Sequence, residues 1–531
     1  MTITAVPSAL RWSPAKTIPL VSALVLLLAW QVAASIGLEE ARVLASPSSI
    51  VQGMVQDAGL YANALTQTAW VAARGWFFGN IVAVALALLF VHFGAIENLL
   101  LKLAVTLFCL PVVALMPILQ LTFEPDTARV VLAALSVFFT TLVATVLGLR
   151  SADRGSLTLI RAWGGGEVAA TWRVRLRSAL PSLIGGLQIA APAAVLGAIF
   201  GEFIGGTSGL GVILINGMGS LDPVRVWSVA VLATLLAAGP YALLALVGRA
   251  LNGWSAGLTP QPSVAPAPPR PLWARLLVGA AWTVGSISVV IGFWFAYLAV
   301  FDVSAYVGKS PIDVVVYLSD PAEGPARIDR LLGALGTTLV HAGIGYAAGL
   351  LVGTAIAVLF LRTPAAEWAF SPVTIALRSV PLVVMTPLLI LVFGRGLGGV
   401  AVITTIVTFF PTLATMLAAL RRTPTDALTL LRSYDASFGV TLWRVHLPFA
   451  LPALFAAARV AAPTAVLAAT LAEWLATGDG LGSLIATSRS HSDYVGLWAG
   501  AALLTATSLV AYSVVTALER WVLRRYSAAE L

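Results

Sequence analysis

The chain has 531 residues, of which 59% are hydrophobic and only 10% are charged, and its formal net charge is +8. Because globular water-soluble domains carry roughly 25% charged residues, this composition excludes a water-soluble fold. The Lys and Arg residues lie mostly in short loops between apolar runs, which indicates orientation in a membrane rather than nucleic-acid binding. We therefore expect a multi-span membrane protein that contacts the lipid bilayer and no nucleic acid.

Apolar runs recur along the whole chain, and about 20 such residues suffice to cross a hydrocarbon core of about 30 Å. In the first half they lie at residues 19–36, 75–93, 101–123, 130–149, 181–203 and 226–247. In the second half they lie at 276–300, 334–360, 369–393, 400–420, 448–475 and 495–518. The first run resembles a signal peptide in polarity, but it is long and precedes Glu39 and Glu40, so we expect it to be retained. The predicted fold class is an all-α membrane protein with about twelve transmembrane helices.

A proline-rich stretch separates the two halves. Residues 256–272 contain repeated prolines, which prevent a helix from continuing and favour an extended, solvated spacer. We expect residues 1–255 to form one repeat, residues 256–272 a cytoplasmic linker, and residues 273–531 a second repeat.

The two halves repeat one another. Residues of the first half recur 271 positions later over a long stretch without gaps. The matched residues are Trp172, Pro181, Pro192, Glu202, Gly209, Gly211, Asp222 and Trp227 with Trp443, Pro452, Pro463, Glu473, Gly480, Gly482, Asp493 and Trp498. Upstream the shift is 270 positions, as for Pro111 and Pro381. Since each half has about six spans, an even number, the repeats are predicted to be parallel, with a pathway at their interface.

Loop charge predicts the orientation. Arginines crowd one loop of each half and the C-terminal tail, namely Arg150, Arg154, Arg161, Arg173, Arg175 and Arg177, then Arg421, Arg422, Arg432 and Arg444, then Arg520, Arg524 and Arg525. By the positive-inside rule these segments are cytoplasmic. We therefore expect both termini on the cytoplasmic side of a bacterial inner membrane.

The two arginine-rich loops carry a shared pattern of a short apolar segment, a break, a basic segment and a Leu-Pro return. The segments lie at 156–166 and 172–181 in the first half, and at 428–437 and 442–452 in the second. They resemble the "EAA" loop of permease subunits in binding-protein-dependent ABC importers, most closely the nitrate, sulfonate and taurine branch. The resemblance extends to the proline-rich third span of each half and to Glu202 and Glu473 with the Gly-Leu-Gly that follows each.

This resemblance implies a type I ABC importer permease fold with two permease copies fused in one chain. It also implies a coupling helix in each loop that docks on a cytoplasmic ATPase subunit. The residues expected to dock are Leu157, Ile160, Arg161, Trp163, Gly164, Gly165, Leu431, Arg432, Tyr434, Asp435 and Ala436. Leu157, Ile160 and Trp163 are spaced i, i+3, i+6, which gives an apolar face able to enter a groove. The alternative is an interfacial helix lying against lipid headgroups, which uses the same pattern.

The loops depart from the family pattern at two places. Thr158 and Thr429 stand where the family has Glu near the start of the loop. Asp435 stands where the first copy has Gly164, at the position expected to adopt the left-handed turn that ends the coupling helix. The two docking sites are therefore expected to be unequal.

Glu202 and Glu473 lie near the external ends of their predicted spans, where a carboxylate costs less than at mid-membrane. They are candidates for gate or pathway residues. The alternative is an interfacial carboxylate that is hydrogen-bonded to the following glycine-rich turn.

No catalytic motif is found in the sequence. Gly308-Lys309-Ser310 lacks the first glycine of a phosphate loop, because Val303 occupies that position, and no His pair lies at metal-ligand spacing. We expect no catalytic residue, metal or cofactor in this chain. The resemblance implies Mg-ATP on two partner ATPase subunits, an extracytoplasmic solute-binding protein, and a small solute such as nitrate, a sulfonate or taurine.

Two other function classes are less consistent with the sequence. An ion-driven secondary transporter with parallel repeats usually carries mid-span acidic or His residues, which are scarce here. An intramembrane enzyme acting on lipid needs a cluster of nucleophile, acid or metal ligands at one depth, and the sequence offers none.

Overall fold

The computed structural model describes residues 14–38, 44–110, 112–251, 272–370, 386, 389–390 and 392–527. All regular secondary structure in those ranges is helical. Within the described ranges, eight helical segments are long and apolar enough to cross a membrane, namely Ala58–His92, Pro125–Arg150, Glu167–Gly205, Pro223–Leu251, Gly324–Arg362, Leu397–Arg421, Phe438–Leu475 and Tyr494–Arg524. Shorter apolar helices lie at Val21–Ile36, Leu210–Gly219 and Ile287–Val300.

The described residues of the first repeat form eleven α-helices and two π-helical turns. In chain order they are α1 (Pro14–Ala33), η2 (Ala34–Leu38), α2 (Pro47–Gln56), α3 (Ala58–His92), α4 (Gly94–Cys109), α5 (Val112–Thr122), α6 (Pro125–Arg150), α7 (Arg154–Ala162), α8 (Glu167–Ala170), η3 (Thr171–Arg175), α9 (Leu176–Gly205), α10 (Leu210–Gly219) and α11 (Pro223–Leu251).

The second repeat follows the same order over its described residues. Its elements are α12 (Leu272–Val300), α13 (Pro311–Ser319), α14 (Gly324–Arg362), α17 (Leu397–Arg421), α18 (Thr425–Ser433), α19 (Phe438–Thr441), η4 (Leu442–His446), α20 (Leu447–Ala472), η5 (Glu473–Thr477), α21 (Gly480–Ser490) and α22 (Tyr494–Ser527). The predicted run 369–393 and the predicted linker 256–272 lie almost wholly outside the described residues. The other predicted spans lie on these helices to within one residue at their ends, except the run 101–123.

One predicted span is not a single helix. The run 101–123 was expected to be continuous, but the structure divides it into α4 and α5. Leu110 between them has φ −64° and ψ 129°, an extended conformation. The reason is Pro111, because proline lacks the N–H that a helix needs and its ring disfavours helical ψ in the residue before it.

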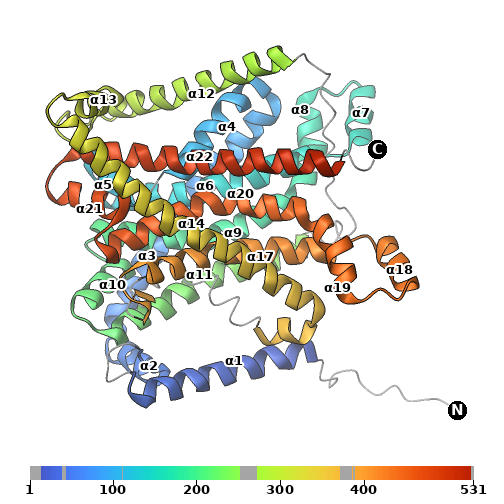
Figure 1. The fold of residues 1–531 in the computed structure, drawn as a ribbon, viewed down its shortest axis with the longest axis horizontal. Helices are drawn as coiled ribbons and strands as arrows, with labels where there is room; N and C mark the ends of the chain where they lie inside the picture. Colours follow the sequence, from blue (N-terminus) through green and yellow to red (C-terminus); the bar gives the residue numbers. More distant parts are fainter. Residues whose placement is uncertain are drawn as a thin grey trace.

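The long helices pack in the same way in both repeats. Helix α6 lies against α3 and α9, and α17 lies against α14 and α20 (Figure 1). Glycines allow the close approach: a Cβ added at Gly79 would lie 2.5 Å from the Ala134 carbonyl oxygen, and one at Gly349 would lie 1.8 Å from Thr408 Oγ1. Small residues at helix crossings let the backbones approach closely, and the resulting van der Waals contacts favour helix association in membranes, where lipid tails are as apolar as the side chains.

The two repeats share one seam and one core. Helices α4 and α5 of the first repeat contact α12, α20 and α22 of the second, and α5 also contacts α21. A single cluster of buried hydrophobic side chains extends across this seam, from Ile199 and Leu210 to Leu471 and Leu481. The seam is therefore packed, and the repeats form one body.

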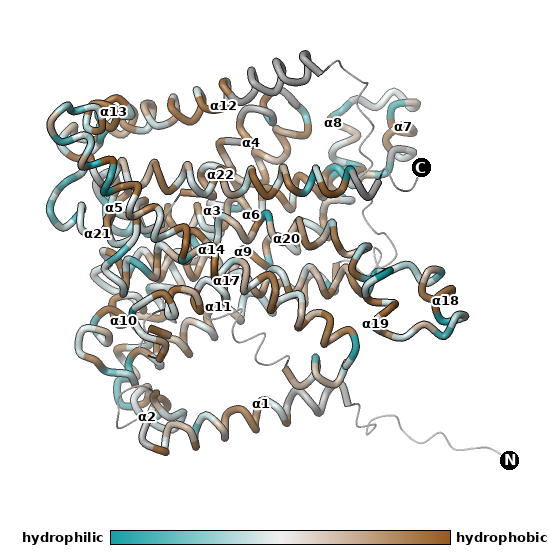
Figure 2. The backbone as a smooth tube through the Cα atoms, viewed as in Figure 1, coloured by the Kyte–Doolittle hydropathy of each residue, from teal (hydrophilic) through white to brown (hydrophobic). Residues whose placement is uncertain are grey.

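Equivalent elements of the two repeats lie at the same end of the molecule. In Figure 1, α7, α8, α18 and α19 lie at one end, with the start of α1 and the end of α22, whereas α2, α10, α13 and α21 lie at the other. Figure 2 shows apolar residues along the long helices and hydrophilic residues gathered towards these two ends. This arrangement is that of parallel repeats whose helices cross the membrane between the two ends.

Candidate functional site

The loop helices α7 and α18 begin differently. The carboxylate of Asp153 caps α7 by accepting hydrogen bonds from the backbone N–H of Ser156 at 2.7 Å and from its hydroxyl at 2.9 Å. These bonds lower the pKa of Asp153, because they stabilise its charged form. Helix α18 has Pro424 at this position, which makes no side-chain cap bond.

Both loop helices end in the same left-handed turn. Gly164 has φ +77° and Asp435 has φ +51°, which is the conformation that the sequence predicted at this position. The N–H of Gly165 donates to the Ile160 carbonyl at 2.9 Å, and the N–H of Ala436 donates to the Leu431 carbonyl at 3.0 Å. This pattern is a Schellman motif, which satisfies carbonyls that the helix end leaves free.

Four apolar side chains project from the two loop helices. Trp163 is 80% exposed and Tyr434 is 77% exposed, while Leu159 and Leu430 are 52% and 59% exposed. Leu159 and Leu430 were missed in the sequence, although each lies four residues before its aromatic neighbour, the spacing that places side chains on one helix face. Of the other residues expected to dock, Arg161, Gly164, Arg432 and Asp435 are exposed, and Leu157, Ile160, Gly165, Leu431 and Ala436 are half-buried.

The two loops differ in charge. In the first loop, the Glu167 carboxylate forms ion pairs with Arg161 and Arg175, at N–O distances of 2.6 Å and 3.1 Å. In the second, Phe438 and His446 stand at the positions of Glu167 and Arg175, and the Phe438 ring lies under the Arg362 guanidinium at 5.5 Å. The loops therefore share a backbone turn and present different electrostatic surfaces.

We predict opposite effects of exchanging the two turn residues. Gly164→Ala places a Cβ in the left-handed region and destabilises the first turn by about 1 kcal/mol, whereas Asp435→Gly stabilises the second by a similar or smaller amount. Hydrogen exchange of the Gly165 and Ala436 amides measures this, with faster exchange expected in Gly164→Ala and slower exchange in Asp435→Gly. Equal exchange in variant and parent would show that the turn is not what protects these amides.

The two predicted carboxylates are buried at the opposite end of the molecule. Glu202 is 1% exposed and Glu473 is 0% exposed. Oε2 of Glu202 accepts from Thr68 Oγ1 at 2.8 Å and from the Gly211 N–H at 3.0 Å. Oε2 of Glu473 accepts from Thr338 Oγ1 at 2.8 Å and from the Gly482 N–H at 3.1 Å. Each carboxylate thus joins a long helix, α3 or α14, to the first turn of α10 or α21.

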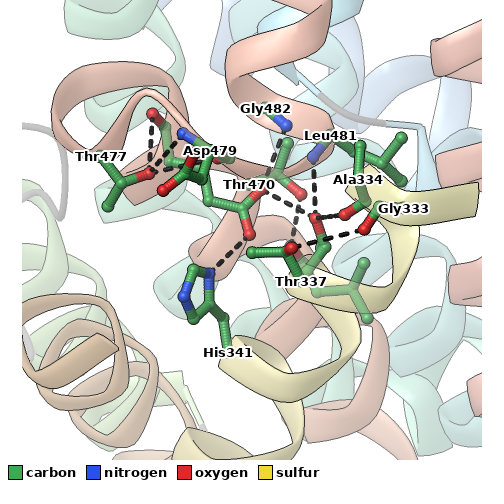
Figure 3. A network of polar contacts seen from close by, with 12 residues as sticks. Gly333, Ala334, Thr337, His341, Thr470, Thr477, Asp479, Leu481 and Gly482 are labelled. Atoms are coloured by element: carbon green, nitrogen blue, oxygen red, sulfur yellow. Dashed lines mark hydrogen bonds and ion pairs between the residues drawn. The ribbon is translucent and has the colours of Figure 1, made fainter. Parts of the chain in front are cut away.

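The threonines complete this connection. The N–H of Leu210 donates to Thr68 Oγ1 and that of Leu481 donates to Thr338 Oγ1, both at 2.9 Å. Figure 3 shows the Leu481 and Gly482 amides directed at this network. Since the first N–H groups of a helix have no partner within it, side-chain acceptors there satisfy donors that burial would otherwise leave unpaired.

The glycine before each leucine is required by the carboxylate. Gly209 has φ +110° and Gly480 has φ +84°. A Cβ at either position would lie 2.2 Å from the carboxylate carbon of Glu202 or Glu473. The Gly-Leu-Gly motif therefore combines a left-handed turn with direct packing against the buried carboxylate.

The two carboxylates have different further partners. Nδ1 of His341 lies 2.8 Å from Oε1 of Glu473, and His341 points towards the network in Figure 3. The equivalent position in the first repeat is Val71, and Oε1 of Glu202 has no hydrogen-bond partner among the described residues. Arg129 packs beside Gly201, next to Glu202 in sequence, where the second repeat has an uncharged residue.

An aromatic pair connects the two repeats next to these carboxylates. Phe203 and Trp474 follow Glu202 and Glu473 and are the same position of the two repeats. Their ring centroids lie 5.7 Å apart at an interplanar angle of 79°, and Phe200 lies 6.0 Å from Trp474. Such edge-to-face pairs stabilise a contact beyond the area that they bury. The sequence alone did not identify this pair, although its place beside the two Glu residues was a signal.

The comparisons with known proteins identify the family. The family described as "Binding-protein-dependent transport system inner membrane component" matches residues 79–256 and again residues 334–527. The chain belongs to this family. Because the match occurs twice, the two repeats are two permease units in one chain, as the internal repetition predicted.

Several known permeases are similar to this chain. The formylaminopyrimidine transport permease protein ThiX of Halalkalibacterium halodurans is 25% identical over 233 residues, which cover 43% of this chain and 91% of the relative. The riboflavin transport system permease protein RibX of Chloroflexus aurantiacus is 32% identical over 158 residues, which cover 30% of this chain and 59% of the relative. The putative aliphatic sulfonates transport permease protein SsuC of Escherichia coli is 30% identical over 190 residues, which cover 35% of this chain and 72% of the relative.

Family membership and the helical architecture confirm two predictions. The fold is that of a type I ABC importer permease with two parallel repeats, and the chain is a transport component of an ABC importer for a small solute. Nothing in the comparisons supports the alternative of an ion-driven secondary transporter.

Proposed function

We propose that this chain supplies both membrane halves of one importer, whose ATP hydrolysis takes place on two separate cytoplasmic ATPase subunits. The observation that carries the proposal is the pair of loop helices α7 and α18. They lie at the same end of the molecule (Figure 1). They expose Leu159 with Trp163 and Leu430 with Tyr434. An exposed aliphatic and aromatic pair on one face of a short helix suits a hydrophobic groove on a partner.

In this scheme the predicted docking residues sit against the ATPases, and Mg-ATP binds only on those partners. ATP binding draws the two ATPase subunits together, and α7 and α18 move with them. Because α9 and α20 continue from these loops to Glu202 and Glu473, the movement reaches the aromatic pair that connects the two repeats. Glu202 and Glu473 act as gate anchors, holding α10 and α21 to the helices that move.

The opposite end receives the solute. A solute-binding protein on the external side docks on the end formed by α2, α10, α13 and α21 and releases solute towards the seam. In this proposal α7 and α18 lie in the cytoplasm of a bacterial cell, with both termini on that side of the inner membrane, and the arginine-rich loops support this orientation. The boundaries 1–255 and 273–531 enclose the two permease units, joined by the cytoplasmic linker 256–272.

The solute belongs to the small molecules carried by related permeases. The names of the relatives refer to aliphatic sulfonates, riboflavin and formylaminopyrimidine. For this chain we propose nitrate, a sulfonate or taurine as the transported solute, because its arginine-rich loops resemble those of the nitrate, sulfonate and taurine branch.

Co-purification tests the function. The tagged chain, isolated from its native host in mild detergent, is expected to bring down a P-loop ATPase that hydrolyses ATP. Proteoliposomes of the complex with its binding protein are expected to take up solute only with internal ATP. A chain that purifies alone and takes up solute along an ion gradient without ATP would contradict the proposal.

A further inference from the structure

A polar contact crosses the seam between the repeats at the external end. Nη2 of Arg489, on α21 of the second repeat, donates to Oε1 of Gln120, on α5 of the first repeat, at 3.2 Å. Helices α5 and α21 are in contact there. The two side chains therefore come from opposite repeats and meet where the repeats join.

Arg489 is a half-buried cation that has no counter-ion in the part of the chain that the structure describes. Among the described residues, no carboxylate lies within 4.0 Å of its guanidinium, whereas Arg129, Arg225 and Arg327 at the same end pair with Asp or Glu. Burial lowers the pKa of Arg489, because the charged guanidinium has lost part of its water. A desolvated guanidinium with free donors favours an anion.

The side-chain amide of Gln120 also packs against the end of α9. A Cβ at Gly205 would lie 1.5 Å from Gln120 Nε2, so the amide packs directly on the backbone at the end of α9. Its Oε1 accepts from Arg489, and its Nε2 hydrogens remain donors. The guanidinium and the amide therefore bring N–H donors from both repeats to the seam.

The site occurs once in the molecule. The residue equivalent to Arg489 in the first repeat is Met218, and the residue equivalent to Gln120 in the second repeat is Ile390. A permease made of two identical chains would carry any such residue twice, whereas two halves of different sequence, as in this fused chain, can carry it on one side. Gly205 lies two residues after Phe203, so the site is within one helical turn of the aromatic pair that connects the two repeats.

We propose that Arg489 and Gln120 form a single binding site for an oxyanion group, a sulfonate, phosphate or carboxylate, which the transported solute carries as it enters the seam. The inference rests on the proposed import function and names the chemical class of its solute. A planar guanidinium matches two oxygens of such a group with parallel hydrogen bonds, and the amide supplies another donor.

Binding of methanesulfonate, with its neutral analogue dimethyl sulfone, tests the site. Both are titrated against the full chain in nanodiscs of zwitterionic lipid, with the thermal unfolding temperature as the measure of binding. Methanesulfonate is expected to stabilise the parent chain and dimethyl sulfone is not. Arg489→Met and Gln120→Ile, which copy the equivalent residues, are each expected to weaken methanesulfonate binding at least about tenfold. The control, Arg395→Met at an exposed arginine of the described residues, is expected to bind as the parent does.

Two additional titrations distinguish charge from geometry and solute from lipid. Arg489→Lys keeps the charge without the planar fork, so its binding is expected to lie between parent and Arg489→Met. Repeating the titration in anionic phosphatidylglycerol nanodiscs tests whether the site binds a solute or the phosphate of a lipid headgroup. Loss of the methanesulfonate effect there would overturn the solute assignment, as would equal stabilisation by the two probes or unchanged binding by Arg489→Met.

Transport by the complete complex distinguishes this site from the import function itself. Arg489→Met is expected to raise the KM for uptake of an oxyanion solute while the associated ATPase still hydrolyses ATP. Absence of any associated ATPase would contradict the import function, whereas unchanged KM in an active complex would contradict only the site.

Discussion

Replacing both Trp163 and Tyr434 with Asp is expected to abolish ATP-driven uptake while leaving the membrane fold unchanged. The two side chains are 80% and 77% exposed, so neither supports the core. Aromatic anchors in the centre of an interface each contribute about 2 kcal/mol or more, about thirtyfold in affinity. An Asp in an apolar groove adds the cost of desolvating a charge. The amount of ATPase that co-purifies, and the ATP that it hydrolyses, measure the loss.

Two other tryptophans provide a matched control. Trp172 and Trp443 are also equivalent residues and are 68% and 73% exposed, but they lie in the π-helical turns after the loop helices. Trp172→Asp with Trp443→Asp is expected to retain the ATPase. If the Trp163 and Tyr434 variant also retains it and instead loses affinity for lipid, the loop helices are interfacial helices and the docking proposal is wrong.

The spans and the repeat could be predicted because their signals are local or periodic. A run of about 20 apolar residues needs no partner to be recognised, since the bilayer itself selects it. The shift of 271 positions is visible by aligning the chain with itself. The left-handed turns at Gly164 and Asp435 were also predictable, because a helix end constrains the conformation of a single residue.

The bond from each Glu to the glycine-rich turn that follows it was one of the two interpretations of the sequence, and the structure contains it in both repeats. The other polar contacts could not be predicted, because they join distant parts of the chain. His341 and Glu473 are 132 residues apart, and Gln120 and Arg489 are 369 apart. A lone His or Gln in an apolar run carries no signal for its partner. The choice between Leu157 and Leu159 as the exposed residue of α7 likewise depends on how the loop packs, which the spacing alone does not determine.

The asymmetry of the two carboxylates predicts a second large effect. Glu473→Ala is expected to lower the free energy of unfolding by about 2–3 kcal/mol, because three buried donors lose a bond to the carboxylate. Two of them are left unpaired, at roughly 1–3 kcal/mol each, whereas Thr338 Oγ1 keeps its bond to the Ala334 carbonyl at 3.1 Å. The donors are Thr338 Oγ1, His341 Nδ1–H and the Gly482 N–H. Glu202→Ala removes the acceptor of only two, Thr68 Oγ1 and the Gly211 N–H, so its effect is expected to be smaller. Unfolding in SDS, followed by circular dichroism, measures both.

His341→Val is the control, because it gives the second repeat the Val that stands at position 71 of the first. It removes a single hydrogen-bond partner of Glu473, so the free energy of unfolding is expected to fall by about 1 kcal/mol. Equal losses in the two Glu variants would show that His341 does not contribute to the network. A Glu473→Ala chain that is as stable as the parent but transports nothing would make the carboxylate a pathway residue, since an anchor of α21 cannot be removed without loosening the helix that it holds.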